Sequence, residues 1–316
     1  MNVLPMPTAS RRAVGLRSIL VATDASPDAH VALGAATDLA KRSGAQLHLV
    51  TAYNLPAAAV YAYSGYFASD EPADPFEADA LAILEKEQVR VESLGGRVAA
   101  LHTGTGPTFD VIERVADEVD ADLIVVGSRD IGGLHRLLAG SVSTSVLHTT
   151  HRPVLIVRGG EGSWPPARLV VGVDRSRESK RAALVAASIA GLYTDSVVEL
   201  LEVLPDPLAP TAHYFNLDSE LAVEQEHLDA LAESLEHVTG RAVSAATAFG
   251  TPADALLARG EDQTGPNLLV VGTRGLGGMR RLFLGSVSTR ILHSGHKPVL
   301  VVPADGDGVA AAAAPQ

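Results

Sequence analysis

Short apolar runs alternate with longer amphipathic stretches along the whole chain. In the first half, the apolar runs at 18–23, 46–52, 97–102, 122–127 and 153–157 predict strands. The stretches at 28–42, 77–94, 107–118 and 141–149 predict helices, and residues 54–75, rich in Ala, Tyr, Pro and Ser, predict an irregular excursion. Strands that alternate with helices are typical of a doubly wound α/β fold, with a parallel sheet covered by helices on both faces.

The same order of elements returns in the second half of the chain. Strands are predicted at 168–173, 197–203, 241–247, 267–272 and 298–302, and helices at 177–191, 219–238, 252–259 and 286–293. Aligning 127–157 with 272–302 gives 18 identities in 31 positions, which indicates a duplicated domain. We therefore expect a tail at 1–15, domains at 16–158 and 168–303, a turn-rich linker at 159–167 and a disordered tail at 304–316.

A glycine pattern of the form G-x2-G-x9-G-[ST] follows the fourth predicted strand of the second half. It comprises Gly272, Gly275, Gly285 and Ser286, and its last two residues stand where a helix is predicted to begin. Glycine lets backbone N–H groups approach an anion closely, and a helix N-terminus carries roughly half a positive charge. The pattern therefore predicts a phosphate-binding loop, unlike the Walker and dinucleotide patterns, neither of which is present. The alternative is that these glycines only form tight turns and that Ser141 and Ser286 are ordinary helix caps.

An acidic residue ends the first predicted strand of each half, Asp24 in one and Asp174 in the other. Ligands of doubly wound sheets bind beyond the carboxyl ends of the strands, where the strand order reverses. If strands one and four are neighbours, the acid and the glycine loop meet at that crevice. The acid would then accept hydrogen bonds from a ribose or an adenine amine, and the alternative is that it only caps the loop before Ser26 or Ser176.

Composition excludes several classes of protein. The 316 residues suffice for two domains, and a net charge of −12 with a pI near 5.3 argues against nucleic acid or an anionic membrane as a partner. The absence of cysteine excludes disulfides and thiolate chemistry, and no signal-like or membrane-spanning apolar run occurs, so we expect a cytoplasmic protein. Histidine pairs at 148/151 and 293/296 lack a third ligand in the sequence, so no metal site is predicted. Abundant arginine and alanine suggest a bacterial origin.

Three sets of segments resemble the universal stress protein family over about residues 16–303, as a tandem pair. They are Thr23-Asp24-Ala25-Ser26 with Val173-Asp174-Arg175-Ser176, the glycine loops at 127–141 and 272–286, and the Pro-Val-Leu endings at 152–157 and 297–302. The resemblance implies five-stranded sheets of order 3-2-1-4-5, ATP binding where the glycine motif is kept, and dimerisation through the last strands.

Carried over by motif, the resemblance implies two sets of ATP-binding residues. In the second half they are Gly172, Val173, Asp174 and Val203 for adenosine, and Gly272, Arg274, Gly275, Gly285, Ser286, Val287 and Ser288 for the phosphates. In the first half they are Ala22, Thr23, Asp24, Ala52, Gly127, Arg129, Gly140, Ser141, Val142 and Ser143.

The first half departs from the motif because Asp130 replaces the second glycine. A carboxylate about 4 Å from a phosphate opposes binding by up to about 4 kcal/mol at an effective dielectric constant near 20. The second half is therefore predicted to be the better site, although Mg²⁺ could bridge Asp130 to the phosphates.

The predicted function is that of a nucleotide-binding stress-response module whose ATP occupancy alters conformation or contacts with an unknown protein partner. We expect paired halves within the chain and a homodimer, and we assign no catalytic residues. The alternatives are a slow ATP hydrolase or phosphotransferase that uses the same pocket, and a structural dimer with degenerate nucleotide sites.

Overall fold

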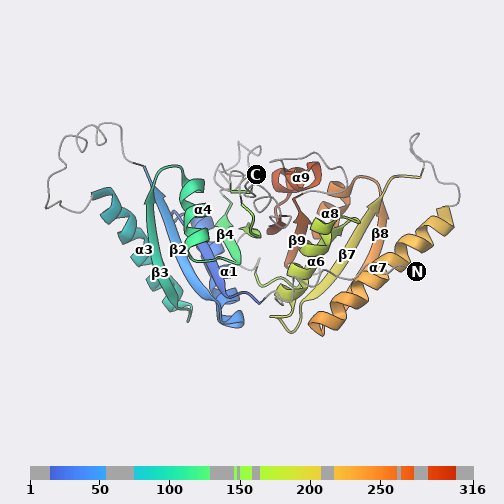
Figure 1. Ribbon diagram of the computed structural model, residues 1–316, viewed down its shortest axis with the longest axis horizontal. Coiled ribbons are helices and arrows are strands. Elements are labelled where there is room, and N and C mark those ends of the chain that lie inside the picture. Colours follow the sequence, from blue (N-terminus) through green and yellow to red (C-terminus); the bar gives the residue numbers. More distant parts are fainter. Residues whose placement is uncertain are drawn as a thin grey trace, which may run out of the picture.

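The computed structural model describes residues 15–54, 75–128, 146–147, 150–158, 164–207, 217–261, 265–273 and 284–303. We refer to residues 15–158 as the first half and to residues 164–303 as the second half (Figure 1). The first half contains β1 (Ser18–Ala22), α1 (Pro27–Ser43), β2 (Gln46–Tyr53), α3 (Pro75–Ser93), β3 (Val98–Thr105), α4 (Thr108–Glu118), β4 (Leu123–Gly127) and β5 (Val154–Val157).

The second half repeats this order of elements. It contains β6 (Arg168–Val173), α6 (Arg177–Ala190), β7 (Val197–Leu204), α7 (Leu217–Thr239), β8 (Val243–Phe249), α8 (Pro252–Gly260), β9 (Asn267–Gly272), α9 (Ser286–Ser294) and β10 (Val299–Val302). The third strand of each half ends later than predicted, because Thr105 and Phe249 pair with the last residues of β2 and β7. The predicted excursion lies almost wholly outside the described residues, and only 146–147 of the helix predicted at 141–149 is described.

All ten strands form one sheet, in the order β3-β2-β1-β4-β5-β10-β9-β6-β7-β8. This order confirms the predicted order 3-2-1-4-5 in both halves. Neighbouring strands within a half are parallel. The halves meet where β5 and β10 pair antiparallel, with Leu155 opposite Leu300. The last strands therefore join the two halves of the chain, as the resemblance implied.

The sheet buries side chains on both faces, because successive residues of a strand point to opposite sides. Ile19 and Val21 belong to the core cluster that includes α1, α3, α6 and α7, whereas Leu20 belongs to the cluster that includes α4, α8 and α9. The doubly wound arrangement makes β1 a neighbour of β4, and β6 a neighbour of β9, so their carboxyl ends open on one crevice in each half.

Helices α1 and α6, which follow the first strand of each half, begin in the same way. Ser26 caps α1 by accepting a hydrogen bond from the N–H of Ala29 at 3.2 Å, and Pro27 takes the first helical position. Ser176 caps α6 by accepting one from the N–H of Ser179 at 3.1 Å. A Ser cap followed by a proline is a strong helix start, and α1 extends one residue beyond each end of the helix predicted at 28–42.

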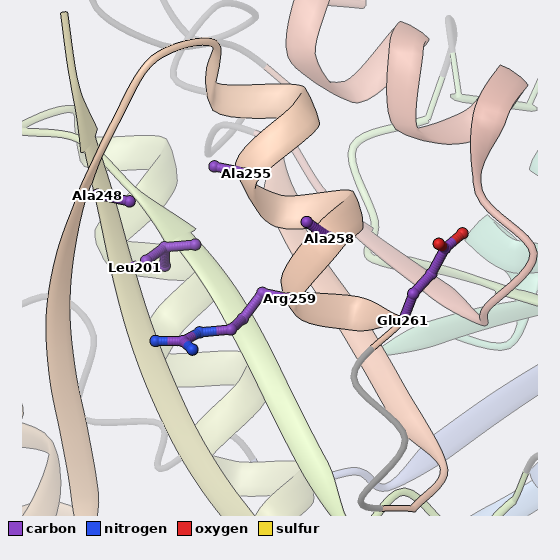
Figure 2. Close-up of a pocket in the computed structure, with 6 residues that line it drawn as sticks. All are labelled: Leu201, Ala248, Ala255, Ala258, Arg259 and Glu261. Atoms are coloured by element: carbon purple, nitrogen blue, oxygen red, sulfur yellow. The ribbon is translucent and has the colours of Figure 1, made fainter. Parts of the chain in front are cut away.

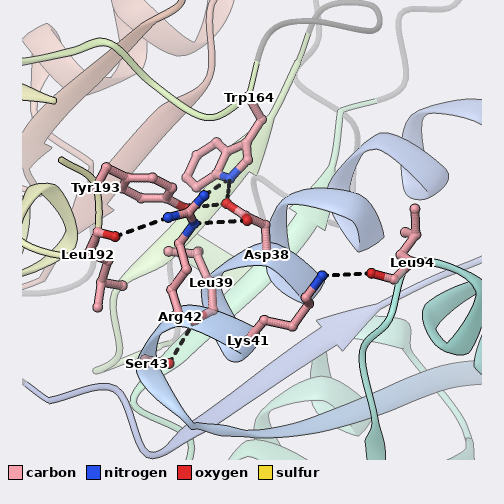
Figure 3. Close-up of polar contacts among 9 residues, drawn as sticks. All are labelled: Asp38, Leu39, Lys41, Arg42, Ser43, Leu94, Trp164, Leu192 and Tyr193. Atoms are coloured by element: carbon pink, nitrogen blue, oxygen red, sulfur yellow. Dashed lines mark hydrogen bonds and ion pairs between the residues drawn. The ribbon is translucent and has the colours of Figure 1, made fainter. Parts of the chain in front are cut away.

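A polar cluster joins the two halves beside their sheet contact (Figure 3). Asp38, on α1, accepts hydrogen bonds at Oδ2 from the indole of Trp164 at 3.1 Å and the hydroxyl of Tyr193 at 2.7 Å. Arg42 donates to Oδ1 of Asp38 at 3.0 Å and lies 4.5 Å from the centre of the Tyr193 ring. Burial, and then the Asp38 carboxylate, raise the pKa of Tyr193, so its phenol stays a donor. We call these four residues the clasp.

Candidate functional site

Three segments of the second half converge at the carboxyl end of the sheet. They are the end of β6 with Gly172, Val173 and Asp174, the end of β9 at Gly272, and the start of α9. The N–H of Gly285 donates to the carbonyl of Thr273 at 2.7 Å, and the N–H of Thr273 donates to the carbonyl of Val302 at 3.0 Å. These bonds fix the first residue of the α9 turn against the end of β9. We call this place the second crevice.

The N-terminus of α9 provides backbone donors at the second crevice. Gly285 is the N-cap residue and makes no side-chain cap, and the first helical hydrogen bond runs from the N–H of Thr289 to the carbonyl of Gly285 at 3.0 Å. The N–H groups of Ser286, Val287 and Ser288 belong to the first turn, where an α-helix supplies no acceptors of its own. Such a helix end favours anions. The alternative interpretation of Ser286 as the helix cap is wrong, because Gly285 occupies that position.

Ser288 contributes to this turn through its buried side chain. Only 1% of Ser288 is exposed, and its hydroxyl donates to the carbonyl of Gly285 at 3.0 Å. This hydrogen bond braces the first turn from within. The backbone N–H of Ser288 is therefore the group that suits a ligand. Ser286, by contrast, is exposed.

The acids at the ends of β1 and β6 both shape the turn into the next helix. Asp24 accepts a hydrogen bond from the N–H of Ser26 at 3.0 Å, and Asp174 accepts one from the N–H of Ser176 at 3.0 Å. The Ser176 hydroxyl also donates to Asp174. The loop-capping interpretation thus describes a real role in both halves, and a role in holding a ligand remains a prediction.

A buried carboxyl group lies close to Asp174. Glu202, near the end of β7, is 8% exposed and shares a hydrogen bond with Glu224 of α7. Burial, and then the charge of Glu224, raise the pKa of Glu202 to about 7, although Arg175 opposes this shift. Arg175 also forms an ion pair with Glu224, which raises the pKa of its guanidinium. The β6 side of the second crevice is therefore acidic, whereas its α9 side favours anions.

Gly172 and Val203 occupy places set by packing. Val173 lies opposite Glu202 in the β6–β7 register, so Val203, the next residue, lies at the carboxyl end of β7, where it is half-buried. A Cβ atom at Gly172 would lie 2.8 Å from Cδ1 of Leu256 on α8. The close approach of α8 is thus one reason for a small residue at this position.

In the first half, the structure brings together only part of the predicted set. Ala22, Thr23 and Asp24 end β1 beside β4, and Ala52 lies near the end of the neighbouring strand β2. A Cβ atom at Gly127 would lie 2.7 Å from the backbone carbonyl of Asp28, so the start of α1 crosses directly over this glycine. The remaining predicted positions lie outside the described residues: Arg129, Asp130, Gly140, Ser141, Val142 and Ser143, and in the second half Arg274 and Gly275.

A groove of about 510 Å³ lies elsewhere, between α8 and the strands β7 and β8 (Figure 2). It is lined by Leu201, Ala248, Ala255, Ala258, Arg259 and Glu261. Gly106 and Gly250 occupy equivalent turns, because the N–H of Gly106 donates to the last carbonyl of β2 and that of Gly250 to the last carbonyl of β7. Ala255 and Ala258 therefore correspond to Val111 and Arg114 of the first half. Two alanines thus line the groove where the first half has larger side chains, and Ala248 lies opposite Val203 in the β7–β8 register.

Neither a metal centre nor a membrane segment emerges from the described parts of the chain. Among these residues, no group of three or more His, Asp or Glu side chains is arranged to hold a metal ion. None of the helices described there combines the length and apolar character needed to cross a bilayer.

The sequence analysis missed two features, one beside the second crevice and one at the opposite end of α9. The carboxyl pair of Glu202 and Glu224 had one signal, because Glu199 and Glu202 interrupt an otherwise apolar strand. No signal in the sequence pointed to Arg158, which contacts the C-terminal end of α9, because it follows β5 in the first half. Its contact depends on the pairing of β5 with β10, which spacing in the sequence does not reveal.

Comparison with known proteins gives one consistent family. The sequence profile described as the Universal stress protein family matches residues 15–158 and 167–303. A universal stress protein of Mycolicibacterium smegmatis is 35% identical over 189 residues, which cover 58% of this chain and 62% of the relative. Another, from Mycobacterium tuberculosis, is 28% identical over 229 residues, covering 71% of this chain and 73% of the relative. The match to the first relative thus spans less than two thirds of its length.

The solved structures show the same architecture. The crystal structure of a universal stress protein from Archaeoglobus fulgidus superposes with a TM-score of 0.69 at 22% sequence identity. The match covers 92% of this chain and 99% of that chain. At this identity the likeness establishes the fold alone.

Proposed function

Because the chain belongs to the universal stress protein family, we propose that it is an ATP-binding regulatory module that uses the second crevice. The observation that carries this proposal is the 2.7 Å hydrogen bond from Gly285 to Thr273, which sets the N-terminus of α9 against the end of β9. The first-turn N–H groups of α9, with Gly272, Arg274 and Gly275, bind the phosphates. Asp174, with Gly172, Val173 and Val203, holds the adenosine end.

The charges around the second crevice support one direction of binding. Asp174, Glu224 and the partly ionised Glu202 outweigh the positive charge of Arg175 on the β6–β7 side, so a phosphate placed there would be repelled. The uncharged adenosine is therefore favoured on that side. The phosphates are favoured at the α9 end, where the helix dipole attracts them.

Binding fits this crevice better than fast catalysis, the alternative function. Rapid phosphoryl transfer needs a held Mg²⁺ and a residue that positions the attacking nucleophile. Within the described residues, no group of three or more His, Asp or Glu side chains is arranged to hold a metal ion. We propose that ATP occupancy changes the contacts of the protein with a partner protein, and that turnover stays far below about 10 per second, the median for enzymes.

A homodimer of whole chains would need a surface other than the last strands. Strands β5 and β10 already pair with each other inside the chain. The contact through which the resemblance implied dimerisation is therefore occupied by the two halves. A structural dimer with degenerate sites is the second alternative, and it predicts no nucleotide binding.

The test begins with the nucleotide that the purified protein carries. Denaturation should release ATP or a related nucleotide, and calorimetry should show tighter binding of ATP than of adenosine. Absence of heat and of competition at millimolar ATP would refute the proposal. Turnover near 10 per second that is lost in Asp174→Ala would instead favour the hydrolase.

Ser286→Asp provides a sharp variant for this test. The residue is exposed in the first turn of α9, where an acidic side chain favours the helix but repels phosphate. ATP affinity should fall at least tenfold, a change of about 1.4 kcal/mol, with stability unchanged. Thr108→Asp, which adds the same charge to the first turn of α4, is the matched control and should bind ATP normally. Gly275→Asp should weaken binding as well, since it adds a side chain and a charge to the glycine pattern.

A further inference from the structure

Arg158 of the first half reaches the C-terminal end of α9 in the second half. It follows β5, is 8% exposed, and donates hydrogen bonds to the carbonyls of Leu292 at 2.6 Å and Gly295 at 2.8 Å. The last carbonyls of a helix lack donors within the helix, and a cation there is favoured by the helix dipole. A planar guanidinium can satisfy two such carbonyls at once. Arg158 is therefore a cap supplied by the other half of the chain.

The opposite end of this helix forms part of the second crevice. Helix α9 has nine residues and is about 13 Å long at 1.5 Å per residue. Its N-cap residue Gly285 donates a hydrogen bond to Thr273, and its buried residues Ile291 and Leu292 pack in the core cluster that includes α8. Figure 1 shows α9 above β9 and beside α8, close to the middle of the molecule. A contact that fixes the C-terminus of so short a rod also fixes the direction of its N-terminal N–H groups.

The residue of the second half that is equivalent to Arg158 cannot make this contact in the reverse direction. Val157 and Val302 end equivalent strands, so the counterpart of Arg158 in the second half is Pro303. A proline side chain has no hydrogen-bond donor. The carbonyl of Pro303 instead accepts a hydrogen bond from Arg181 of its own half at 2.6 Å. The duplicated domains have thus become different at this position.

We propose that Arg158 is a positioning residue for the second crevice, through which the first half sets the direction of the phosphate-binding end of α9. This inference rests on the proposed function for its consequence on ATP, but the anchoring of α9 can be measured without nucleotide. Arg158 contacts the C-terminal end of the helix, and the N-terminal N–H groups contact the phosphates.

The experiment compares Arg158→Met and Arg158→Lys with Arg152→Met in the full chain. Arg152 is the matched control, because it donates to the carbonyl of Ala121 at 2.8 Å and to Asp117 at 2.7 Å, both within the first half. Each protein is studied without nucleotide by hydrogen exchange of residues 286–294, and with ATP by calorimetry, under conditions where it is fully folded. Thermal unfolding records any general loss of stability.

We expect faster exchange in α9 and about tenfold weaker ATP binding in Arg158→Met, a coupling typical of linked sites. Arg158→Lys, which keeps the charge and one donor direction, should recover part of both losses. Arg152→Met should lose stability while keeping wild-type exchange in α9 and wild-type affinity. If Arg158→Met does not fold, the lysine variant alone decides, since it should still exchange faster in α9 than the wild type.

Two results would overturn the proposal. One is unchanged exchange of α9 in both Arg158 variants, which would mean that the cap does not hold the helix. The other is an equal loss of affinity in Arg152→Met, which would mean that general destabilisation explains the effect. If wild-type protein binds no ATP, the proposed function fails, and the exchange of α9 without nucleotide still decides whether Arg158 anchors the helix.

Discussion

At the scale of single residues, two glycines near the carboxyl ends of strands are required for different reasons: Gly127 ends β4 and Gly172 lies near the end of β6. A Cβ atom at Gly127 would lie 2.7 Å from the backbone carbonyl of Asp28 and 2.8 Å from the N–H nitrogen of Ala29. At Gly172 the nearest atom is a methyl group of Leu256, also at 2.8 Å. A methyl group can turn away, whereas the backbone of α1 cannot move without disturbing the helix. The first glycine of the pattern in the first half is thus required for packing, whatever it binds.

This difference predicts unequal costs for two alanine substitutions. Gly127→Ala should lower the free energy of unfolding by about 1–3 kcal/mol, because it forces the start of α1 away from β4. Gly172→Ala should cost less than about 1 kcal/mol, since Leu256 can adjust and a strand tolerates alanine. Urea unfolding of the two variants measures both values. Equal costs would show that the α1 backbone yields as easily as a side chain.

Glu202 is a second residue whose surroundings determine a measurable property. Its pKa is raised to about 7 in the folded protein by burial and Glu224, and Arg175 and Asp174 are the other charged groups that act on it. The unfolded chain releases the same proton near pH 4.5. Between these pH values the folded state binds more protons than the unfolded state. The stability that Glu202 contributes is therefore fully present below about pH 4.5 and is lost as the pH rises to about 7.

Glu202→Gln should therefore flatten this pH dependence. The amide stays neutral at every pH, so the wild type should lose stability relative to the variant, on the order of 3 kcal/mol between pH 4.5 and 7. Unfolding in urea at several pH values measures the difference. Glu226→Gln, at an exposed position of α7, the helix that carries Glu224, is the control and should follow the wild type. Parallel curves for Glu202→Gln and the wild type would contradict the shifted pKa.

At the scale of secondary-structure elements, the sequence predicted the fold well because its signals are local. The apolar runs of β1 to β10 and the Ser-Pro start of α1 specify elements through neighbouring residues alone. The strand order also followed, through the repeat and the family resemblance. The prediction of ATP-binding residues stays a prediction.

Features that depend on distant contacts could not be predicted in this way. The hydrogen bond between Glu202 and Glu224 joins a strand to a helix, and Arg158 reaches α9 from the other half. Sequence periodicity reports which residues face a core, but it does not report which polar side chains meet across elements. The N-cap of α9 was also uncertain, since both glycine and serine are accepted as caps and here Gly285 takes the position.

The glycine segment of the first half provides a prediction at this scale. Asp130 takes the place of the second glycine, and a carboxylate opposes phosphate binding. In a Gly275→Asp background, where only the first half can report, Asp130→Gly should tighten ATP binding severalfold, which corresponds to about 1 kcal/mol. Calorimetric titration of both forms measures this change. Tighter binding by the form that keeps Asp130 would mean that the acid helps, through Mg²⁺.

At the scale of the whole molecule, two kinds of contact join the halves. The β5–β10 pair makes the sheet continuous through apolar residues such as Leu155 and Leu300, which are fully buried. The clasp adds directional contacts, because Asp38 receives donors from Trp164 and Tyr193 of the second half. Arg42 donates further to the carbonyl of Leu192 at 3.4 Å. Apolar pairing supplies most of the driving force, and the clasp specifies how the halves are oriented.

Asp38→Ala should therefore weaken the molecule as a whole. The substitution leaves three side-chain donors without the carboxylate, so it should lower the free energy of unfolding by about 1–3 kcal/mol. Glu118→Ala is the control, because it removes only an exposed ion pair with Arg114 and should change stability by less than about 0.5 kcal/mol.

The chain contains a single tryptophan, and this residue reports directly on the clasp. In the wild type, Trp164 fluorescence and far-ultraviolet circular dichroism should follow one unfolding transition, because the continuous sheet couples the halves. In Asp38→Ala the emission of Trp164 should shift to longer wavelength at lower urea, before the secondary structure is lost, since the indole then loses the carboxylate and keeps the hydroxyl of Tyr193, at 3.1 Å, as its acceptor. Coincident transitions in the variant, at the wild-type urea concentration, would show that the sheet alone holds the two halves together and that the clasp adds no stability.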